Sequence, residues 1–292
     1  MQRPSAVLRD SRGAAVTPLV LPSSATTIQQ ARGHEQQFLE RFQRSFARVK
    51  RVYSPLDKCH YTLAAADRVG EWTDPYPVVA NLMKEARLYD SELLESLPHN
   101  RSLRFIVRTR SLLGRRKPRV AVVAASRSPL ARLARTGGAI ERLDAAELHQ
   151  AIREQLRAPG VYHVLGLLST VGWSHDVTQR VPRGEDFAVV LIEPAAPGGW
   201  KLYDSLPKPL GELRAVFEPE EHHEKVTRVL ELLRQVPELR IPGGHVEIEA
   251  LLNEFGVDDE VLDEALRLLS QEESRIKRVA VSGRPLLKRD RY

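Results

Sequence analysis

The sequence predicts an α+β protein with an N-terminal helical region, a central mixed or antiparallel sheet with helices, and a C-terminal domain of helices followed by a hairpin. Three patterns lead to this fold class: apolar alternation at 103–107 and 120–126, a well-delimited helix at 144–156, and helical periodicity after residue 220. The predicted segments are a disordered tail (1–28), a helical region (29–98), a basic α+β domain (99–215) and a C-terminal domain (216–292).

The composition is that of a globular protein. Of the 292 residues, 42% are hydrophobic and 28% charged. No apolar run reaches about 18 residues, so no membrane span is expected. Cys59 is the single cysteine, which rules out an intrachain disulfide and argues against a thiolate zinc site. These features favour a cytoplasmic location, and the excess of arginine over lysine suits a bacterial, GC-rich genome.

The N-terminal region begins with residues rich in Arg, Ser and Ala and interrupted by prolines, a composition that favours a disordered tail over a transit peptide. Apolar residues then recur at helical spacing and predict a helix with a buried aromatic stripe: Phe38, Phe42, Phe46, Val49 and Tyr53. Asp74 followed by Pro75 predicts the start of a second helix.

The central domain is expected to begin with a hairpin, because LRFIVRT and VAVVAAS flank the charged connection GRRKP at 114–118. A helix follows, with Asp144 as its N-cap, Glu147 three residues later and Pro159-Gly160 as its end. Residues 161–168 predict a strand covered on both faces, since both alternate sets are largely apolar. Two more strands are predicted at 187–194 and 200–204, and the segment down to Pro219 is expected to be a linker.

The C-terminal segment contains three helical stretches, EEHHEKVTRVLELLRQV, HVEIEALLNEFG and DDEVLDEALRLLSQEE, and then RIKRVAVSGRPLLKR, which predicts a hairpin. This order resembles a winged-helix domain over about 75 residues. DNA-binding members of that family place the third helix in the major groove. Here the third helix departs from that pattern, because its charged residues are seven acids and Arg267. The resemblance therefore implies that a basic wing contacts nucleic acid, or that the domain binds protein or a second copy through its acidic helix.

The clearest charge anomaly is a run from Arg101 to Arg135 without an acid. Its basic residues are Arg101, Arg104, Arg108, Arg110, Arg115, Arg116, Lys117, Arg119, Arg127, Arg132 and Arg135. Such a run predicts contact with phosphates and a steep salt dependence. The other interpretation is pairing of the same bases within the chain or with an acidic protein partner. The residues expected at a nucleic-acid interface are Arg104, Arg108, Arg110, Arg115, Arg116, Lys117, Arg119, Lys277, Arg278 and Arg284.

An enzymatic interpretation rests on the order of elements from Asp144 to Gln235, which resembles the core of PD-(D/E)XK nucleases. That resemblance implies carboxylates that hold Mg²⁺ and a lysine that assists the attacking water. Asp186 and Lys201 match two of these positions, but Gly199 stands where the defining carboxylate is required, so Glu193 would have to replace it. No cofactor is expected unless this nuclease alternative holds.

Residues 169–176 offer a second, weaker catalytic pattern, in which Ser169 or Thr170 is the nucleophile and His175 or Asp176 the base. No G-x-S-x-G motif precedes Ser169, and adjacent His and Asp side chains usually diverge, so a structural loop is the favoured interpretation. The leading expectation is thus a non-catalytic protein that binds DNA or RNA through its basic central domain. The alternatives are a metal-dependent nuclease and an assembly subunit that binds an acidic protein.

Overall fold

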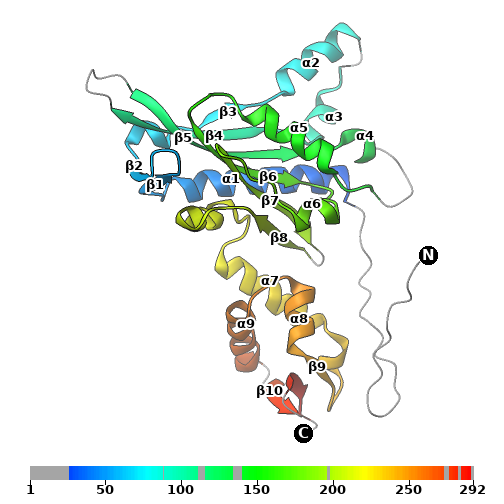
Figure 1. The fold of residues 1–292 in the computed structure, drawn as a ribbon. Coiled ribbons are helices and arrows are strands. Elements are labelled where there is room, and N and C mark those ends of the chain that lie inside the picture. The colour runs from blue at the N-terminus through cyan, green and yellow to red at the C-terminus, as the bar shows by residue number, and fades with distance from the viewer. Residues whose placement is uncertain are drawn as a thin grey trace, which may run out of the picture.

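The computed structural model describes residues 26–87, 89–110, 116–133, 140–195, 198–272, 276–281 and 284–290. The predicted tail at 1–28 lies almost entirely outside these residues. The centre of the molecule is a six-stranded mixed sheet, which confirms the α+β class (Figure 1). In order across the sheet, its strands are β3 (Glu71–Thr73), β4 (Ser102–Arg110), β5 (Arg116–Arg127), β6 (Tyr162–Ser169), β7 (Phe187–Ala195) and β8 (Gly199–Asp204).

The predicted hairpin is confirmed, since β4 and β5 pair antiparallel with Phe105 opposite Val122. β5, β6 and β7 are parallel neighbours, and β3 and β8 pair antiparallel with β4 and β7. Every residue of β6 is buried, as expected for a strand covered on both faces. The carboxyl ends of β5 and β6 therefore meet at one edge of the sheet, far from the β4–β5 connection.

Two helical layers cover the sheet on opposite faces (Figure 1). One contains α1 (Ile28–Phe46) and the 3-10 helix η2 (Lys208–Phe217); the other contains α4 (Leu130–Leu133), α5 (Ala145–Gln155) and α6 (His175–Gln179). The predicted aromatic stripe is confirmed on α1, where Phe38, Phe42 and Phe46 are fully buried. The helix ends at Phe46, however, so Val49 and Tyr53 belong to the following loop and strand rather than to the stripe.

The predicted cap of α5 is also confirmed. The Asp144 carboxylate accepts a hydrogen bond from the Glu147 N–H (2.9 Å), and the Glu147 carboxylate accepts one from the Asp144 N–H (3.0 Å). Leu148 and Ile152 of this helix pack on the sheet together with Trp173, which is fully buried.

The segment 29–98 contains more than the helices predicted for it. After α1 come the hairpin β1 (Arg51–Ser54) and β2 (Cys59–Thr62), the 3-10 helix η1 (Ala65–Arg68) and strand β3, followed by α2 (Tyr76–Glu85) and α3 (Ser91–Ser96). β3 extends the central sheet, so this segment and the basic domain share one core. As the Asp74-Pro75 pair predicted, a helix follows, and the Asp74 carboxylate accepts the Tyr76 N–H at 2.9 Å. α2 projects away from the sheet (Figure 1).

The expected linker is a packed element instead. Leu210, Leu213 and Val216 of η2 are buried in the core shared with α1, because a spacing of three residues keeps them on one face of a 3-10 helix. The expected boundary at residue 215 therefore falls inside η2, and only residues 218–221 join it to the next helix.

The C-terminal domain has its own core around Val229, Leu251 and Leu262. Its elements are α7 (His222–Gln235), the 3-10 helix η3 (Pro237–Arg240), β9 (His245–Glu247), α8 (Ile248–Phe255), α9 (Asp259–Glu272), β10 (Ile276–Val281) and β11 (Arg284–Arg289). The three strands form an antiparallel sheet in the order β10–β11–β9. Gly256 ends α8 in the left-handed conformation (φ +62°), which glycine adopts without strain. Across the described part of the chain, no helix is both long and apolar enough to span a bilayer.

Candidate nucleic-acid interface

The basic run from Arg101 to Arg135 contains no acid in the sequence, but in the folded protein acids from other segments lie beside it. Among the described residues, five of its arginines form ion pairs with carboxylates from other parts of the chain. These pairs are Arg101–Glu35 (3.1 Å), Arg108–Glu71 (3.2 Å), Arg119–Asp57 (3.0 Å), Arg132–Glu147 (2.9 Å) and Arg127–Glu154. Pairing within the chain, the second interpretation of the run, therefore accounts for much of it.

Arg104 is a correction to the predicted interface, because it is buried and points into the protein. Its guanidinium donates a 2.6 Å hydrogen bond to the carbonyl oxygen of Gln155, at the carboxyl end of α5. A cation at this position is favourable for the helix dipole. Burial and, secondarily, the neighbouring Arg157 lower the pKa of Arg104. Arg104 therefore caps a helix rather than contacting a ligand at the surface.

The cations at the turn end of the β4–β5 hairpin, where the two strands are connected, differ from the rest of the run. Arg116 and Lys117 are exposed, and neither has an ion-pair partner in the part of the chain that the structure describes. The register places Arg110 opposite Arg116 and Thr109 opposite Lys117. Residues 111–115, including the predicted Arg115, and the side chain of Arg110 lie outside the described part of the structure.

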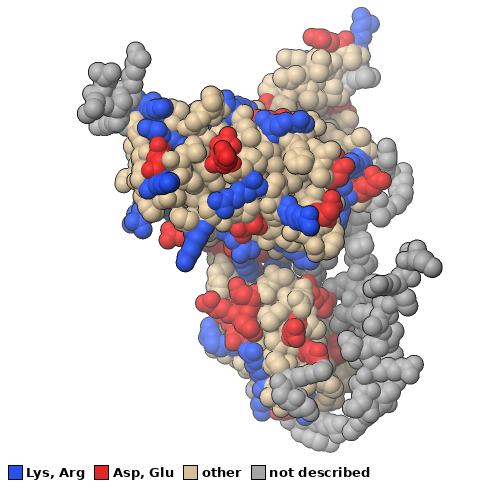
Figure 2. All heavy atoms as spheres, viewed as in Figure 1, with Lys and Arg blue, Asp and Glu red and all other residues tan. Residues whose placement is uncertain are grey.

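A third exposed cation comes from the neighbouring β1–β2 turn. The ion pair between Asp57 and Arg119 holds this turn against the start of β5, and Lys58 follows Asp57 directly. We call Lys58, Arg116 and Lys117 the distal basic patch. Figure 2 shows Lys and Arg side chains gathered at this end of the sheet.

The predicted cations of the C-terminal hairpin are engaged with acids of their own domain. Lys277 pairs with Asp290 (2.8 Å), and Arg278 pairs with Asp259 (3.4 Å) and with Asp263 of the acidic helix α9. The side chain of Arg284 lies outside the described residues. Arg278 thus neutralises part of the charge that made α9 unusual in the sequence.

The residues of the nuclease hypothesis are only partly assembled. Glu193 and Lys201 are directly opposite in register, so they lie on the same face of the sheet. The Glu193 carboxylate is buried, however, and accepts hydrogen bonds from the Trp173 N–H (2.7 Å) and the Tyr203 hydroxyl (3.2 Å). Burial and this carboxylate raise the pKa of Tyr203 to about 12. Glu193 therefore fixes the turn after β6.

The other candidate catalytic groups are not brought together. His175 and Asp176 are exposed at the start of α6, and Asp186 contributes its backbone oxygen to the His163 N–H. The Ser169 hydroxyl donates to the carbonyl of Gly172 at 2.7 Å, and Thr170 bonds the hydroxyl of Ser128. Within the described ranges, no three His, Cys, Asp or Glu residues cluster in a way that could hold a metal ion.

Sequence reasoning missed the buried carboxylate of Glu35. It accepts hydrogen bonds from the backbone N–H groups of His99 (2.8 Å), Asn100 (3.2 Å) and Arg101 (3.0 Å), as well as from the Arg101 side chain. The signal was present in the sequence, because Glu35 is three residues before Phe38 and thus lies on the buried face of α1.

Comparison of the chain with family models, with curated proteins and with solved structures finds no match in any of the three.

Proposed function

We propose that the protein binds nucleic acid non-catalytically through the distal basic patch. The observation that carries this proposal is the contrast within the basic run: its other described cations have partners in the chain, whereas Arg116 and Lys117 are exposed at the tip of a long hairpin. Like charges that lie directly opposite each other destabilise a sheet. The pairing of position 110 with position 116 therefore lowers the stability of the fold, and a bound phosphate would reduce this repulsion.

The proposed interaction is with the phosphate backbone rather than with base edges. The three cations of the distal basic patch predict a log–log salt slope of about −3, since each neutralised phosphate contributes about −0.9. The proposal includes a cytoplasmic location, which the single cysteine favours.

The test is a fluorescence-anisotropy titration of a labelled 20-base-pair duplex and the matching single strand over a range of KCl concentrations. We expect Arg116→Ala/Lys117→Ala to weaken duplex binding at least tenfold at low salt and to reduce the slope by about 2. The matched control is Arg153→Ala/Arg180→Ala, which removes two exposed cations and has the same net charge. Equal weakening in both double variants would mean that net charge, not the patch, governs binding.

The C-terminal domain completes the proposal as a winged helix used for protein contact. Its support is the order helix, strand, helix, helix, strand, strand, with the first strand paired to the last. The carboxylates of α9 repel phosphate, and Lys277 and Arg278 are already paired. Accordingly, Lys277→Ala/Arg278→Ala should leave the duplex Kd within twofold. If this variant lost as much affinity for the duplex as the patch variant, the interface would lie on the wing instead. Cleavage of the duplex in the presence of Mg²⁺ would overturn the non-catalytic assignment.

A further inference from the structure

A cavity of about 500 Å³ lies at the carboxyl end of β5, at the opposite end of that strand from the distal basic patch. Its volume is within the range of small-molecule sites, roughly 300–1,000 Å³. In open sheets with parallel strands, ligands bind outside the carboxyl ends of the strands, and β5 and β6 end together here. The cavity plays no part in the proposed nucleic-acid binding.

One wall of the cavity is apolar and comes from α2, α3, the loop after α3, and α4. It consists of Pro75, Tyr76, Val79, Leu94, Leu97, Pro98 and Leu130. The Tyr76 ring packs against the His99 imidazole, with centroids 4.5 Å apart. Such a wall suits an aromatic or branched apolar group.

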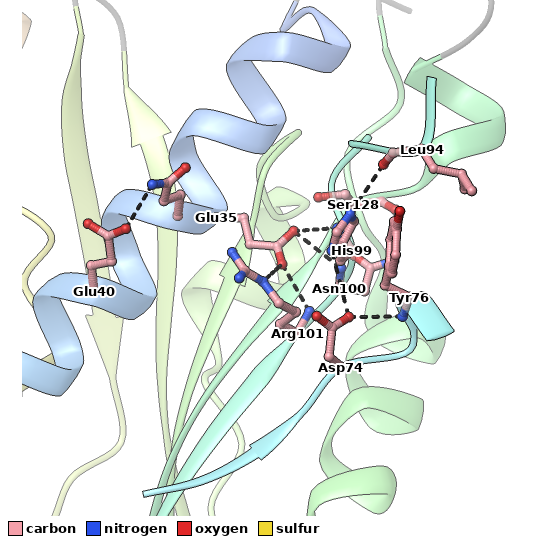
Figure 3. Close-up of polar contacts among 10 residues, drawn as sticks. Glu35, Glu40, Asp74, Tyr76, Leu94, His99, Asn100, Arg101 and Ser128 are labelled. Carbon is pink, nitrogen blue, oxygen red and sulfur yellow. Dashed lines mark hydrogen bonds and ion pairs between the residues drawn. The ribbon is translucent and has the colours of Figure 1, made fainter. Parts of the chain in front are cut away.

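The loop that forms part of this wall is fixed from behind. The Glu35 carboxylate holds residues 99–101 by three backbone hydrogen bonds, and the Asp74 carboxylate lies 3.6 Å from the His99 ring nitrogen on the other side. Figure 3 shows these groups side by side, with Glu35 reaching from α1 and with Asp74 and Tyr76 from the start of α2. The cavity is therefore preorganised rather than formed by a loose loop.

The opposite wall is polar and has an unsatisfied hydroxyl. Ser102, the first residue of β4, is 6% exposed and lines the cavity, and its hydroxyl has no hydrogen-bond partner among the described residues. Buried hydroxyls are nearly always paired, so this group is available to a ligand. Ser102 lies opposite Ala125 of β5 and therefore on the face of the sheet that α5 covers, where Gln155 also lines the cavity.

The charge on this wall is positive. Arg127 is paired with Glu154, but Arg157 has only the Thr73 hydroxyl, at 3.4 Å, as a described partner. Behind it, Arg104 bonds the carbonyl of Gln155, which also lines the cavity. The guanidinium of Arg157 is thus left without a carboxylate, and a guanidinium binds planar or tetrahedral oxyanions through paired N–H groups.

We propose that this cavity binds a small organic anion, with a ring against Tyr76 and Val79 and a phosphate or carboxylate that accepts hydrogen bonds from Arg157 and the Ser102 hydroxyl. The two opposed walls require both parts of the ligand at once. An inorganic anion leaves the apolar wall wet, and a neutral ring leaves Arg157 and Ser102 unpaired.

The experiment is isothermal titration calorimetry of the full chain with phenyl phosphate and phenylacetate, beside inorganic phosphate and phenol. We expect at least one of the first two to bind with a Kd below 1 mM, and the two half-ligands to bind at least tenfold more weakly. Arg157→Met should weaken binding about tenfold and Ser102→Ala about threefold. Arg153→Met, on the exposed face of α5, should leave the Kd unchanged.

Each other result overturns the proposal. These results are no binding by either ring-bearing anion, equal binding of inorganic phosphate or phenol, or binding that survives Arg157→Met. Ser102→Ala keeps the test sound if Arg157→Met misfolds, because the Ser102 hydroxyl makes no hydrogen bond to the described protein. Repeating the titration with the distal-patch variant Arg116→Ala/Lys117→Ala separates this site from the nucleic-acid proposal, and binding should be unchanged.

Discussion

At the scale of single residues, buried carboxylates act as anchors for the backbone. Glu35 is fully buried, yet each of its oxygens accepts hydrogen bonds, and together they fix the loop that leads into β4. Glu193 does the same for the turn after β6. A charged group is tolerated in such places because several N–H donors replace its lost hydration.

Glu35→Gln should therefore destabilise the protein by about 2–3 kcal/mol, since the amide replaces an acceptor oxygen with an NH₂ group that faces N–H donors. Glu40→Gln is the matched control, because Glu40 is exposed on the same helix (Figure 3) and the only described hydrogen bond of its side chain comes from Gln36. The measurement is urea unfolding followed by circular dichroism. Equal free energies of unfolding for both variants would contradict the anchor role.

At the scale of elements, the packing of η2 on the sheet depends on one glycine. A Cβ placed on Gly166 of β6 would lie 2.1 Å from Cδ1 of Phe217, so the aromatic ring occupies the space of a missing side chain. Gly166→Ala should cost about 2 kcal/mol through overpacking, and adding Phe217→Leu should restore part of the loss. Gly33→Ala on the exposed face of α1 meets no neighbour and should instead stabilise by about 0.5–1 kcal/mol. Thermal unfolding of the three variants checks these signs.

The same scale shows what the sequence could predict. The β4–β5 hairpin, the capped helix α5 and the strand β6, which is buried on both faces, could all be predicted. Each follows from local periodicity or from capping residues. The packing of η2 could not be predicted, because its few apolar residues are buried only through contact with α1 and the sheet, which are distant in sequence. Pairing of the basic run could not be predicted either: Glu35, Asp57 and Glu71 are distant in sequence from the arginines that they contact. The cavity combines residues of α2, α3, α4, α5 and three strands, and no local pattern specifies such a combination.

At the scale of the whole molecule, three acids of the short connection, residues 218–221, form ion pairs with the helices on either side, two with α7 and one with α1. Glu218 pairs with Lys225, Glu221 with Arg41 of α1, and Glu220 with Arg228. Arg228 is the central group, because its two bonds to Glu220 (3.0 and 3.1 Å) and one to the Phe255 carbonyl (3.1 Å) link the connection, α7 and α8.

Arg228→Met should therefore cost about 3 kcal/mol, because it leaves the Glu220 carboxylate buried without a partner. We also expect it to divide thermal unfolding into two transitions, with the C-terminal domain unfolding first. Arg267→Met, at an exposed position on α9, should change the free energy of unfolding by less than 0.5 kcal/mol. Differential scanning calorimetry measures both effects, and a single unchanged transition for Arg228→Met would show that the junction does not couple the domains.

The length of β5 sets a distance on the molecular surface. Its twelve residues, Arg116–Arg127, span roughly 35 Å at about 3.3 Å per residue. The distal basic patch and the mouth of the cavity lie at opposite ends of this strand, so a ligand bound at one site is too far away to touch a ligand at the other, and the two proposed sites can be filled and tested independently.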